Sequence, residues 1–358
     1  MVVKLLIING NQFGYDVGYH YYVKYLSKQH KIDYICFDKN LEKIYFPGNE
    51  IKYIEYANKY IDKIKVIFKL GKCIRKGDYD LVLFRNNKYA FLIKLLGGKR
   101  AVFDVRTVSV SPNFLKRRLY NLIVKFNTYF FERIFSISSY IIYYLRISNK
   151  DITIVPLGSN KYFNREEEFI QSLNFLYVGT FNNRNISDTI KGFMIFCREF
   201  PKVKVSYTII GAGNVNEIRK LKSFINKKPD NLNICFEGYI PNNKLEWYFK
   251  KHYIGISYVP ITEYFLPQPV TKTYEYLLAG MAVVATDLPS NTDVITDNNG
   301  VIIQDNPTSF ADGVARIFKN LNLYNPKLIQ KDSRIFEWKY IVDNHLWPGL
   351  EKEIRKYR

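Results

Sequence analysis

The sequence predicts an α/β protein made of two parallel-sheet domains in tandem. Short runs rich in β-branched residues alternate with longer segments of helical periodicity, and this alternation is typical of parallel strands joined by crossover helices. The length of 358 residues fits two domains. Hydrophobic residues make up 47% of the chain and charged residues 24%, which is ordinary globular composition and excludes wholesale disorder.

The first domain is expected to span residues 1–158. Its predicted strands are residues 4–8, 33–37, 51–55, 81–84, 101–104, 134–137 and 152–155. Helical periodicity lies between several of these strands, at residues 18–29, 60–76, 89–96 and 113–131.

The stretch 156–173 mixes Pro, Gly, Asn and a run of Glu, which predicts a linker at residues 159–173. A second domain at residues 174–330 repeats the alternation. Its predicted strands are residues 175–178, 203–210, 234–237, 255–258, 282–285 and 300–303, and its predicted helices are 186–199, 214–225, 244–251, 271–279 and 309–318. The closing segment, 331–358, is helical from residue 336, with a break near Pro348, and we expect it to cross back to the first domain.

Charge is the strongest compositional signal. The chain has 53 Lys and Arg against 33 Asp and Glu, a net charge of +20. Residues 1–160 carry 27 basic and 12 acidic side chains, which indicates an anionic partner such as phospholipid head groups, a diphosphate-bearing acceptor or nucleic acid. The alternative is compositional drift in a chain rich in Lys, Asn, Ile and Tyr.

Several classes of protein are excluded. No apolar run approaches the roughly 20 residues that a membrane span needs, and the N-terminus reads as a first strand rather than a signal peptide. The four cysteines show no CxxC spacing, so a disulfide framework or cysteine zinc site is not expected and a reducing cytosol is favoured. The four histidines form no metal-ligand pair.

Glycine-containing turns follow several predicted strands, where ligands bind in open α/β sheets. Gly14 and Gly18 lie between the first strand and the first helix, where backbone N–H groups can approach an anion. Gly179, Thr180 and Arg184 follow the first strand of the second domain, and an arginine there suits a phosphate. An ordinary turn, with Arg184 solvated, is the alternative.

Two further turns follow later strands of the second domain. Gly211 and Gly213 form a GxG turn of the kind that lines nucleotide clefts. Tyr239 and Ile240 follow another strand end, where the backbone could pair with a base edge. For each of them an ordinary structural turn is equally compatible with the pattern.

The most specific pattern is the block at residues 269–287. A loop leads into a short helix that contains Lys272 and Glu275, ends at Gly280 and precedes a buried strand. Lys272 and Glu275 are three residues apart and share a helix face near its N-terminus. Glu275 stands among Tyr, Leu and Ala, so it needs hydrogen-bond donors, and ligand hydroxyls are one source. The alternative is a local Lys272–Glu275 pair without a ligand.

Together these landmarks resemble the retaining glycosyltransferases of family 4, which have the GT-B fold. In the second half, the similar segments are YVGTF, IIGAG, EGYIP and KTYEYLLAGMAVVATD. In the first half they are VVKLLIING, DVGYHYYVKYL, FDVRT, IFSISSYIIYYL and IVPLGSN, and FEWKYIV resembles the closing aromatic segment. The resemblance covers roughly residues 4–342. It implies two Rossmann-like domains facing each other across a cleft, the first binding an acceptor and the second a nucleotide-sugar.

The resemblance also implies roles for single residues. Glu275 would hydrogen-bond the ribose hydroxyls of the donor. The diphosphate would meet Gly179, Thr180 and Arg184, and the base would meet Tyr239 and Ile240. The remaining donor-binding positions are Gly14, Gly18, Gly211, Gly213, Val270 and Thr271.

The chain departs from the family at several positions. Eight residues before Glu275, where members often have a second glutamate, it has Pro267. Thr180 stands where many members have arginine, while Lys272 is shared with a subset. Where the family often has an N-domain histidine, this chain offers Asp104 and Arg106. The candidate catalytic groups are therefore Arg184, Lys272, Glu275, Asp104 and Arg106.

The implied activity is metal-independent sugar transfer with retention of anomeric configuration. The donor would be a UDP- or GDP-sugar, a substrate rather than a cofactor, and the acceptor a glycan or lipid-linked molecule in cell-surface polysaccharide or glycoconjugate synthesis. The expected location is the cytoplasm, including the inner face of the cell membrane, with no nucleic-acid partner. The alternatives are an epimerase-like enzyme on the same fold, a basic nucleic-acid-binding protein and a catalytically dead paralogue.

Residues 113–131 form a basic amphipathic pattern. Apolar side chains recur at helical spacing, and Lys116, Arg117, Arg118 and Lys125 lie beside them. Such a helix can lie in a membrane interface, so we expect it to bind anionic bilayers. The alternative is that the apolar stripe packs on its own sheet.

Overall fold

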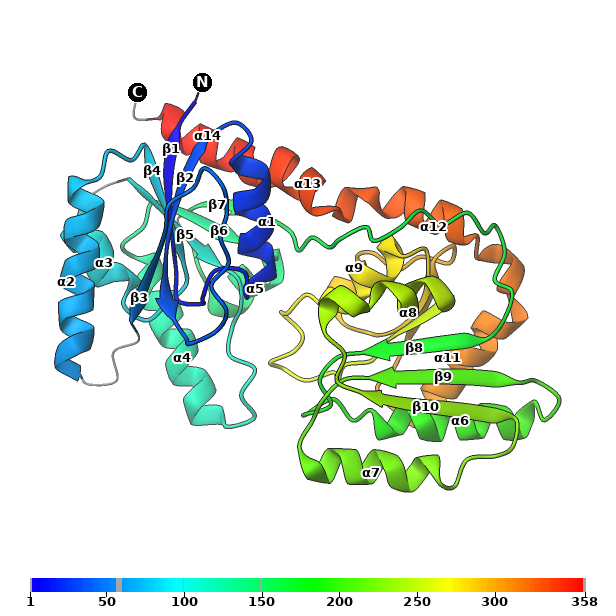
Figure 1. Ribbon diagram of the computed structural model, residues 1–358. Helices are drawn as coiled ribbons and strands as arrows, with labels where there is room; N and C mark the ends of the chain where they lie inside the picture. The colour runs from blue at the N-terminus through cyan, green and yellow to red at the C-terminus, as the bar shows by residue number, and fades with distance from the viewer. Residues whose placement is uncertain (1, 56–59, 99, 149, 357–358) are drawn as a thin grey trace. The chain divides into compact units, whose positions relative to one another are not determined.

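The computed structural model describes residues 2–55, 60–98, 100–148 and 150–356 and divides into two compact units. The first unit contains Met1–Leu157 and Trp338–Arg358, and the second contains Gly158–Glu337. Each unit has a parallel sheet with helices on both of its faces (Figure 1). The predicted architecture of two parallel-sheet α/β domains is therefore confirmed.

The sheet of the first unit has seven parallel strands in the order β3-β2-β1-β4-β5-β6-β7. Its strands are β1 (Lys4–Asn9), β2 (Lys31–Asp38), β3 (Ile51–Glu55), β4 (Leu81–Arg85), β5 (Ala101–Val105), β6 (Arg133–Ser136) and β7 (Asp151–Ile154). The central strand β1 reads KLLIIN and is buried from its second residue on, as expected for a parallel strand covered on both faces. The strand order reverses between β1 and β4, and such a switch point is where open α/β sheets bind ligands.

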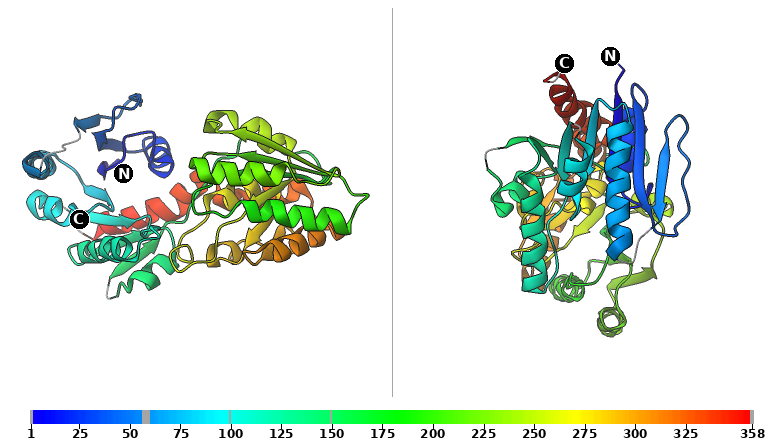
Figure 2. Two further views of the ribbon diagram at one scale, coloured as in Figure 1. Left: turned by 90° about the horizontal axis from the view of Figure 1, so that it is seen from below. Right: turned by 90° about the vertical axis from the view of Figure 1, so that its left-hand side faces the viewer.

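Helices cover both faces of this sheet, which Figure 2 shows from two further sides. One face packs against α1 (Val17–Leu26) and the C-terminal helices α13 (Trp338–Ile341) and α14 (Trp347–Arg355). The other face packs against α2 (Tyr60–Lys76), α3 (Ala90–Gly97), α4 (Phe114–Thr128) and α5 (Ser139–Leu145). The seven-residue α5 is not among the predicted helices, because two turns give little periodicity.

Within the closing segment, Trp338–Arg358 belongs to the first unit and residues 331–337 belong to the second. Trp338 is 3% exposed, and its ring stacks on Tyr21 with centroids 5.8 Å apart. The predicted break near Pro348 takes the form of a π turn, Val342–Leu346, in which the Trp347 N–H donates to the Val342 carbonyl. The helix continues as α14 with Pro348 in its first turn, where no proline N–H is needed.

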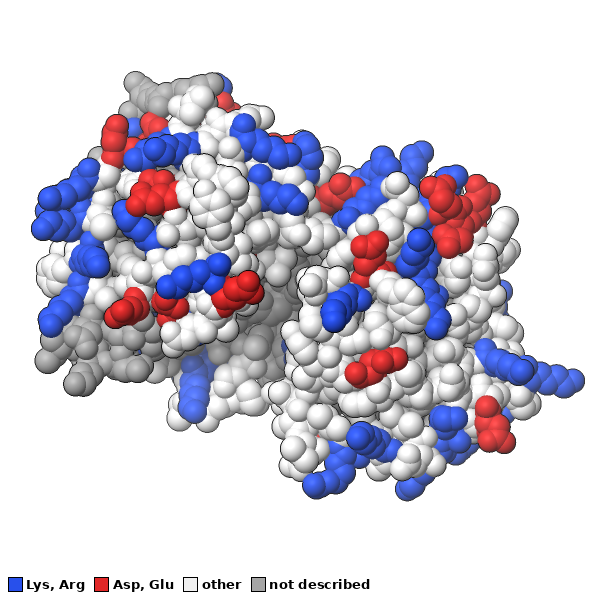
Figure 3. Space-filling model, in the orientation of Figure 1, with Lys and Arg blue, Asp and Glu red and all other residues white. Residues whose placement is uncertain are grey.

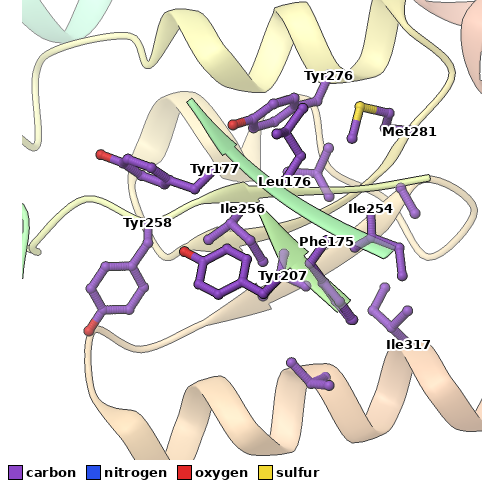
Figure 4. Close-up of a cluster of buried hydrophobic side chains, with 14 of the residues drawn as sticks. Phe175, Leu176, Tyr177, Tyr207, Ile254, Ile256, Tyr258, Tyr276, Met281 and Ile317 are labelled. Carbon is purple, nitrogen blue, oxygen red and sulfur yellow. The ribbon is translucent and has the colours of Figure 1, made fainter. Parts of the chain in front are cut away.

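The sheet of the second unit has six parallel strands in the order β10-β9-β8-β11-β12-β13. Its strands are β8 (Asn174–Val178), β9 (Val205–Ile210), β10 (Leu232–Gly238), β11 (Ile254–Ser257), β12 (Ala282–Thr286) and β13 (Gly300–Ile303). Its α-helices are α6 (Ser187–Glu199), α7 (Val215–Ile225), α8 (Glu246–Lys251), α9 (Thr271–Leu278), α10 (Pro289–Thr292), α11 (Pro307–Lys319) and α12 (Pro326–Asp332). Figure 4 shows part of the core, where the hydroxyls of Tyr177 and Tyr276 point to the same side of the cluster.

Residues 159–173, expected as a linker, are part of the second unit. Arg165 is 2% exposed. Its guanidinium donates to backbone carbonyls at the ends of α8 and α9, those of Phe249, Lys250, His252 and Ala279. The polar composition typical of a linker therefore reflects, in part, a buried arginine that satisfies helix C-termini.

Candidate functional site

The turns after β8, β9 and β10 are hydrogen-bonded side by side. The Gly179 N–H donates to the Ile210 carbonyl at 3.0 Å, and the Gly211 N–H donates to the Gly238 carbonyl at 2.8 Å. Gly211 has φ +153°, and a Cβ atom there would lie 1.8 Å from the Gly179 carbonyl oxygen. Only glycine allows this approach, so the predicted glycine turns meet at one edge of the sheet.

Lys272 reaches the first of these turns from the N-terminal turn of α9. Its Nζ lies 3.8 Å from the centroid of the Tyr177 ring, and a Cβ atom on Gly179 would be 3.0 Å from the same Nζ. The Tyr177 hydroxyl donates to the Thr180 carbonyl at 2.7 Å. The structure therefore brings together Lys272 and the Gly179–Thr180 turn, which are almost 100 residues apart in sequence.

Arg184 lies half-buried beside this lysine. Its guanidinium carbon is 4.1 Å from the centroid of the Phe265 ring, and Phe265 is buried in a small apolar cluster with Val259, Val270 and Leu288. This cluster fixes the loop before α9. Burial lowers the pKa of the Arg184 guanidinium.

The electrostatics of the site favour an anion. Burial, with a smaller repulsion from Arg184, lowers the pKa of Lys272 to about 7. Burial raises the pKa of Glu275 to about 7, although Lys272 opposes that shift. Among the residues that the structure describes, no ion pair of Lys272 or Arg184 with a carboxylate is recorded. Two basic side chains thus lie close together, and Glu275 is the acidic group that acts on Lys272.

A buried hydroxyl network holds α9 in place. The Ser257 and Thr273 hydroxyls are 2.6 Å apart, and Thr273 donates to Asn291 Oδ1 at 2.8 Å. Asn291 Nδ2 donates to the Thr286 carbonyl. Tyr177, Thr273 and Thr286 lie within sequence motifs, but the motifs alone indicate no role for them. Ser257, Phe265 and Asn291 lie outside every motif, so only the tertiary structure shows their place at the site.

The other predicted donor positions of the second unit lie around the same strand ends. Tyr239 is 74% exposed directly after β10, while Ile240 packs partly against the core. Thr180 and Thr271 are exposed, and Val270 is buried as the N-cap residue of α9. Gly213 packs against Phe181, where a Cβ atom would be 2.8 Å from its Cβ.

The glycines predicted in the first unit serve close packing. A Cβ atom on Gly14, which has φ +90°, would lie 2.1 Å from Ile44 Cδ1. At Gly18 it would lie 3.2 Å from the Trp338 ring and 3.5 Å from Arg106 Nη2. Both positions have a structural reason for glycine that requires no ligand.

Asp104 and Arg106 are buried in the first unit. Asp104 is fully buried on β5 and accepts a hydrogen bond from the Tyr19 hydroxyl at 2.8 Å. Arg106 Nη1 donates to the Tyr22 hydroxyl at 2.8 Å and to the Val155 carbonyl. Burial raises the pKa of Asp104, with Arg106 opposing. Both side chains thus have partners within the first unit, and their catalytic role stays a prediction.

Figure 3 shows basic and acidic side chains interspersed over the face that it presents. In the part of the chain that the structure describes, no helix is both long and apolar enough to cross a bilayer. Within the same residues, no group of three or more His, Cys, Asp or Glu side chains is arranged to hold a metal ion.

Comparisons with known proteins agree with this geometry. Residues 172–320 match the family model of the glycosyl transferases group 1. No curated protein sequence matches the chain significantly.

Solved structures show the fold. A glycosyltransferase from Rickettsia africae has a TM-score of 0.71 at 15% identity, over 99% of both chains. HepE from Anabaena, solved with UDP and glucose, has a TM-score of 0.70 at 11% identity, over 98% of this chain and 100% of that chain. The lipopolysaccharide outer core galactosyltransferase WaaB has a TM-score of 0.68 at 14% identity over both whole chains. The fold is therefore GT-B, residues 172–320 match the glycosyl transferases group 1, and the protein is a glycosyltransferase.

Proposed function

We propose that this glycosyltransferase transfers a sugar, with retention of anomeric configuration and without a metal, from a UDP- or GDP-sugar. The acceptor is a glycan or a lipid-linked molecule in the synthesis of a cell-surface polysaccharide or glycoconjugate. Transfer takes place on the cytoplasmic side, at the inner face of the membrane.

The observation that carries the proposal is the cation pair beside the glycine turns. Lys272 and Arg184 lie next to backbone turns that only glycine fits, and α9 begins there without a side-chain cap on its first N–H groups. A helix N-terminus, two cations and a close backbone approach together suit a diphosphate.

The chemistry follows from where charge develops. When the bond from the anomeric carbon to the diphosphate breaks, its electron pair stays on the phosphate oxygen. Lys272, Arg184 and the α9 N-terminus would stabilise this growing charge more than the ground state, which is how such groups lower a barrier. Glu275, one helical turn further, would accept hydrogen bonds from the ribose hydroxyls.

A panel of sugar nucleotides tests the donor site. UDP-, GDP- and ADP-sugars should be compared by ligand-dependent thermal stabilisation, using wild type, Glu275→Gln and the exposed control Glu246→Gln. We expect one nucleotide class to stabilise wild type and the control but not Glu275→Gln. Equal stabilisation of wild type and both variants would contradict the role of Glu275 in binding the ribose.

Product analysis separates transfer from other chemistry. Donor consumption that requires an acceptor supports transfer, while conversion of the donor without one supports an epimerase-like enzyme. The anomeric configuration of the product, read by NMR, tests retention.

The surface of α4 supports the membrane location. Its apolar stripe faces outward, with Leu115, Leu119 and Leu122 exposed by 73%, 61% and 54%, so the alternative of packing on the sheet does not describe it. Residues 105–131 contain no acidic side chain. An exposed apolar stripe bordered only by basic residues suits an anionic bilayer, with about 1 kcal/mol for each basic residue near the surface.

Cosedimentation with vesicles tests this location. At low salt, wild type should bind vesicles rich in phosphatidylglycerol more than neutral ones. Leu119→Glu should reduce that binding, and Leu328→Glu, an equally large change at an exposed leucine of α12 in the second unit, should not. Equal binding to anionic and neutral vesicles, or equal binding of wild type and Leu119→Glu, would refute the membrane proposal.

A further inference from the structure

The first unit contains an apolar cavity of about 220 Å³ between its sheet and two helices. The sheet side is lined by Ile8, Ile35 and Ile54, and the helix side by Val66 and Leu70 of α2 and Ile93 of α3. Aliphatic walls of this kind bind hydrocarbon rather than water or sugar.

The cavity lies at the functional edge of the sheet. Its lining includes Asn9 and Gly10 at the end of β1, Phe37 at the end of β2, and Asn87 just after β4. These are the carboxyl ends of strands on both sides of the β1/β4 switch point, the position where open α/β sheets bind ligands.

Two lysines complete the lining. Lys39 and Lys88 are both exposed and both line the cavity. Lys39 Nζ donates to Asn11 Oδ1 at 2.8 Å, and Lys88 Nζ lies 4.9 Å from the Tyr89 ring centroid. No carboxylate pairs with either lysine among the described residues. The same cavity thus combines an aliphatic interior with cationic groups.

We propose that this cavity holds the hydrocarbon chain of a single-chain lipid phosphate, the lipid acceptor, whose phosphate is met by Lys39 and Lys88. The inference deepens the proposed function, on which it rests, by naming the acceptor class and its site.

The neighbouring helices support this occupant. α3, which forms one wall, packs on α4 through Phe91 and Phe126, whose ring centroids are 5.2 Å apart. The exposed apolar stripe of α4 therefore adjoins the element that encloses the cavity.

Calorimetric binding of alkyl phosphates to the full chain tests the proposal, with octyl, decyl and dodecyl phosphate kept below their micelle concentrations. Because each buried methylene contributes about 0.8 kcal/mol, affinity should rise about fourfold per methylene until the cavity is filled. Val66→Phe fills the cavity and should weaken dodecyl phosphate at least tenfold. Ile64→Phe, an exposed change on the same helix, should leave the affinity unchanged.

The lysines are tested with a charged and an uncharged ligand. Lys39→Ala and Lys88→Ala should each weaken dodecyl phosphate about five- to tenfold and leave dodecanol binding unchanged. Equal losses for both ligands would overturn the phosphate assignment.

Three other results would overturn the cavity site: no binding of dodecyl phosphate to wild type, undiminished binding to Val66→Phe, or equally tight binding of the two-chain dihexanoyl phosphatidylglycerol. Sugar-nucleotide binding, measured in the same samples, reports on the second unit. If wild type bound no sugar nucleotide, that result would count against the proposed function rather than against the cavity site, so the two failures are distinguishable.

Discussion

Donor binding should depend on pH through Lys272. In the free protein, burial and Arg184 hold the pKa of Lys272 near 7, so about half of the molecules carry an ammonium at pH 7. At pH 8.5 only about 3% do. If the diphosphate requires the ammonium, each binding event above pH 7 must include proton uptake, and the affinity falls by about fifteenfold over this range. Ionisation of Glu275, whose pKa is also raised to about 7, offsets this fall by at most about twofold.

The assay is titration calorimetry from pH 7 to 8.5 with the sugar nucleotide selected by the panel, whose diphosphate diester keeps a constant charge over this range. Two buffers of different ionisation enthalpy report the proton taken up. Lys272→Arg keeps its charge and should abolish the decline, whereas Lys272→Met should bind weakly at every pH. An unchanged affinity in wild type, or the same decline in Lys272→Arg, would refute the assignment of Lys272 to the diphosphate.

Substitutions at three further positions test the second unit. Glu275→Ala should lower donor affinity roughly ten- to hundredfold, since hydrogen bonds to a charged group are worth about 1.5–3 kcal/mol each. The raised pKa of Glu275 means that its ionised form destabilises the ligand-free protein above pH 7, so the melting temperature of this variant at pH 8 should not fall. A marked fall in melting temperature would indicate a structural role for Glu275. Arg165→Met should lower the free energy of unfolding by about 3–5 kcal/mol, measured in urea, because removal of the buried guanidinium leaves four carbonyls without their donor. A change below about 1 kcal/mol would contradict this expectation. Thr273→Val should lower the free energy of unfolding by about 1–3 kcal/mol, because it leaves Asn291 Oδ1 without its donor. Thr273→Ser keeps the hydroxyl and should retain most of the stability. Equal losses in both variants would assign the effect to packing.

Local sequence patterns are enough to predict the two-sheet architecture and the helix that carries Lys272 and Glu275. Both depend on local patterns: strands buried on both faces read as continuous apolar runs, and a short periodic helix between a proline-rich loop and Gly280 has clear ends. Residues three apart on a helix are neighbours in any fold, so their proximity required no tertiary information.

The contacts of each side chain, in contrast, depend on how distant parts of the chain pack together. Gly211 must be glycine because its turn meets the Gly179 carbonyl, and this contact exists only because β8 and β9 are neighbours in the sheet. The sequence does not show that Asp104 is buried and accepts a hydrogen bond from the Tyr19 hydroxyl, because Tyr19 is 85 residues away in the chain. The sequence left the outward face of α4 undecided and predicted a linker around Arg165 for the same reason. Composition and periodicity show which face of an element is apolar or polar, but the partner of that face comes from distant parts of the chain, and its position depends on how the elements pack.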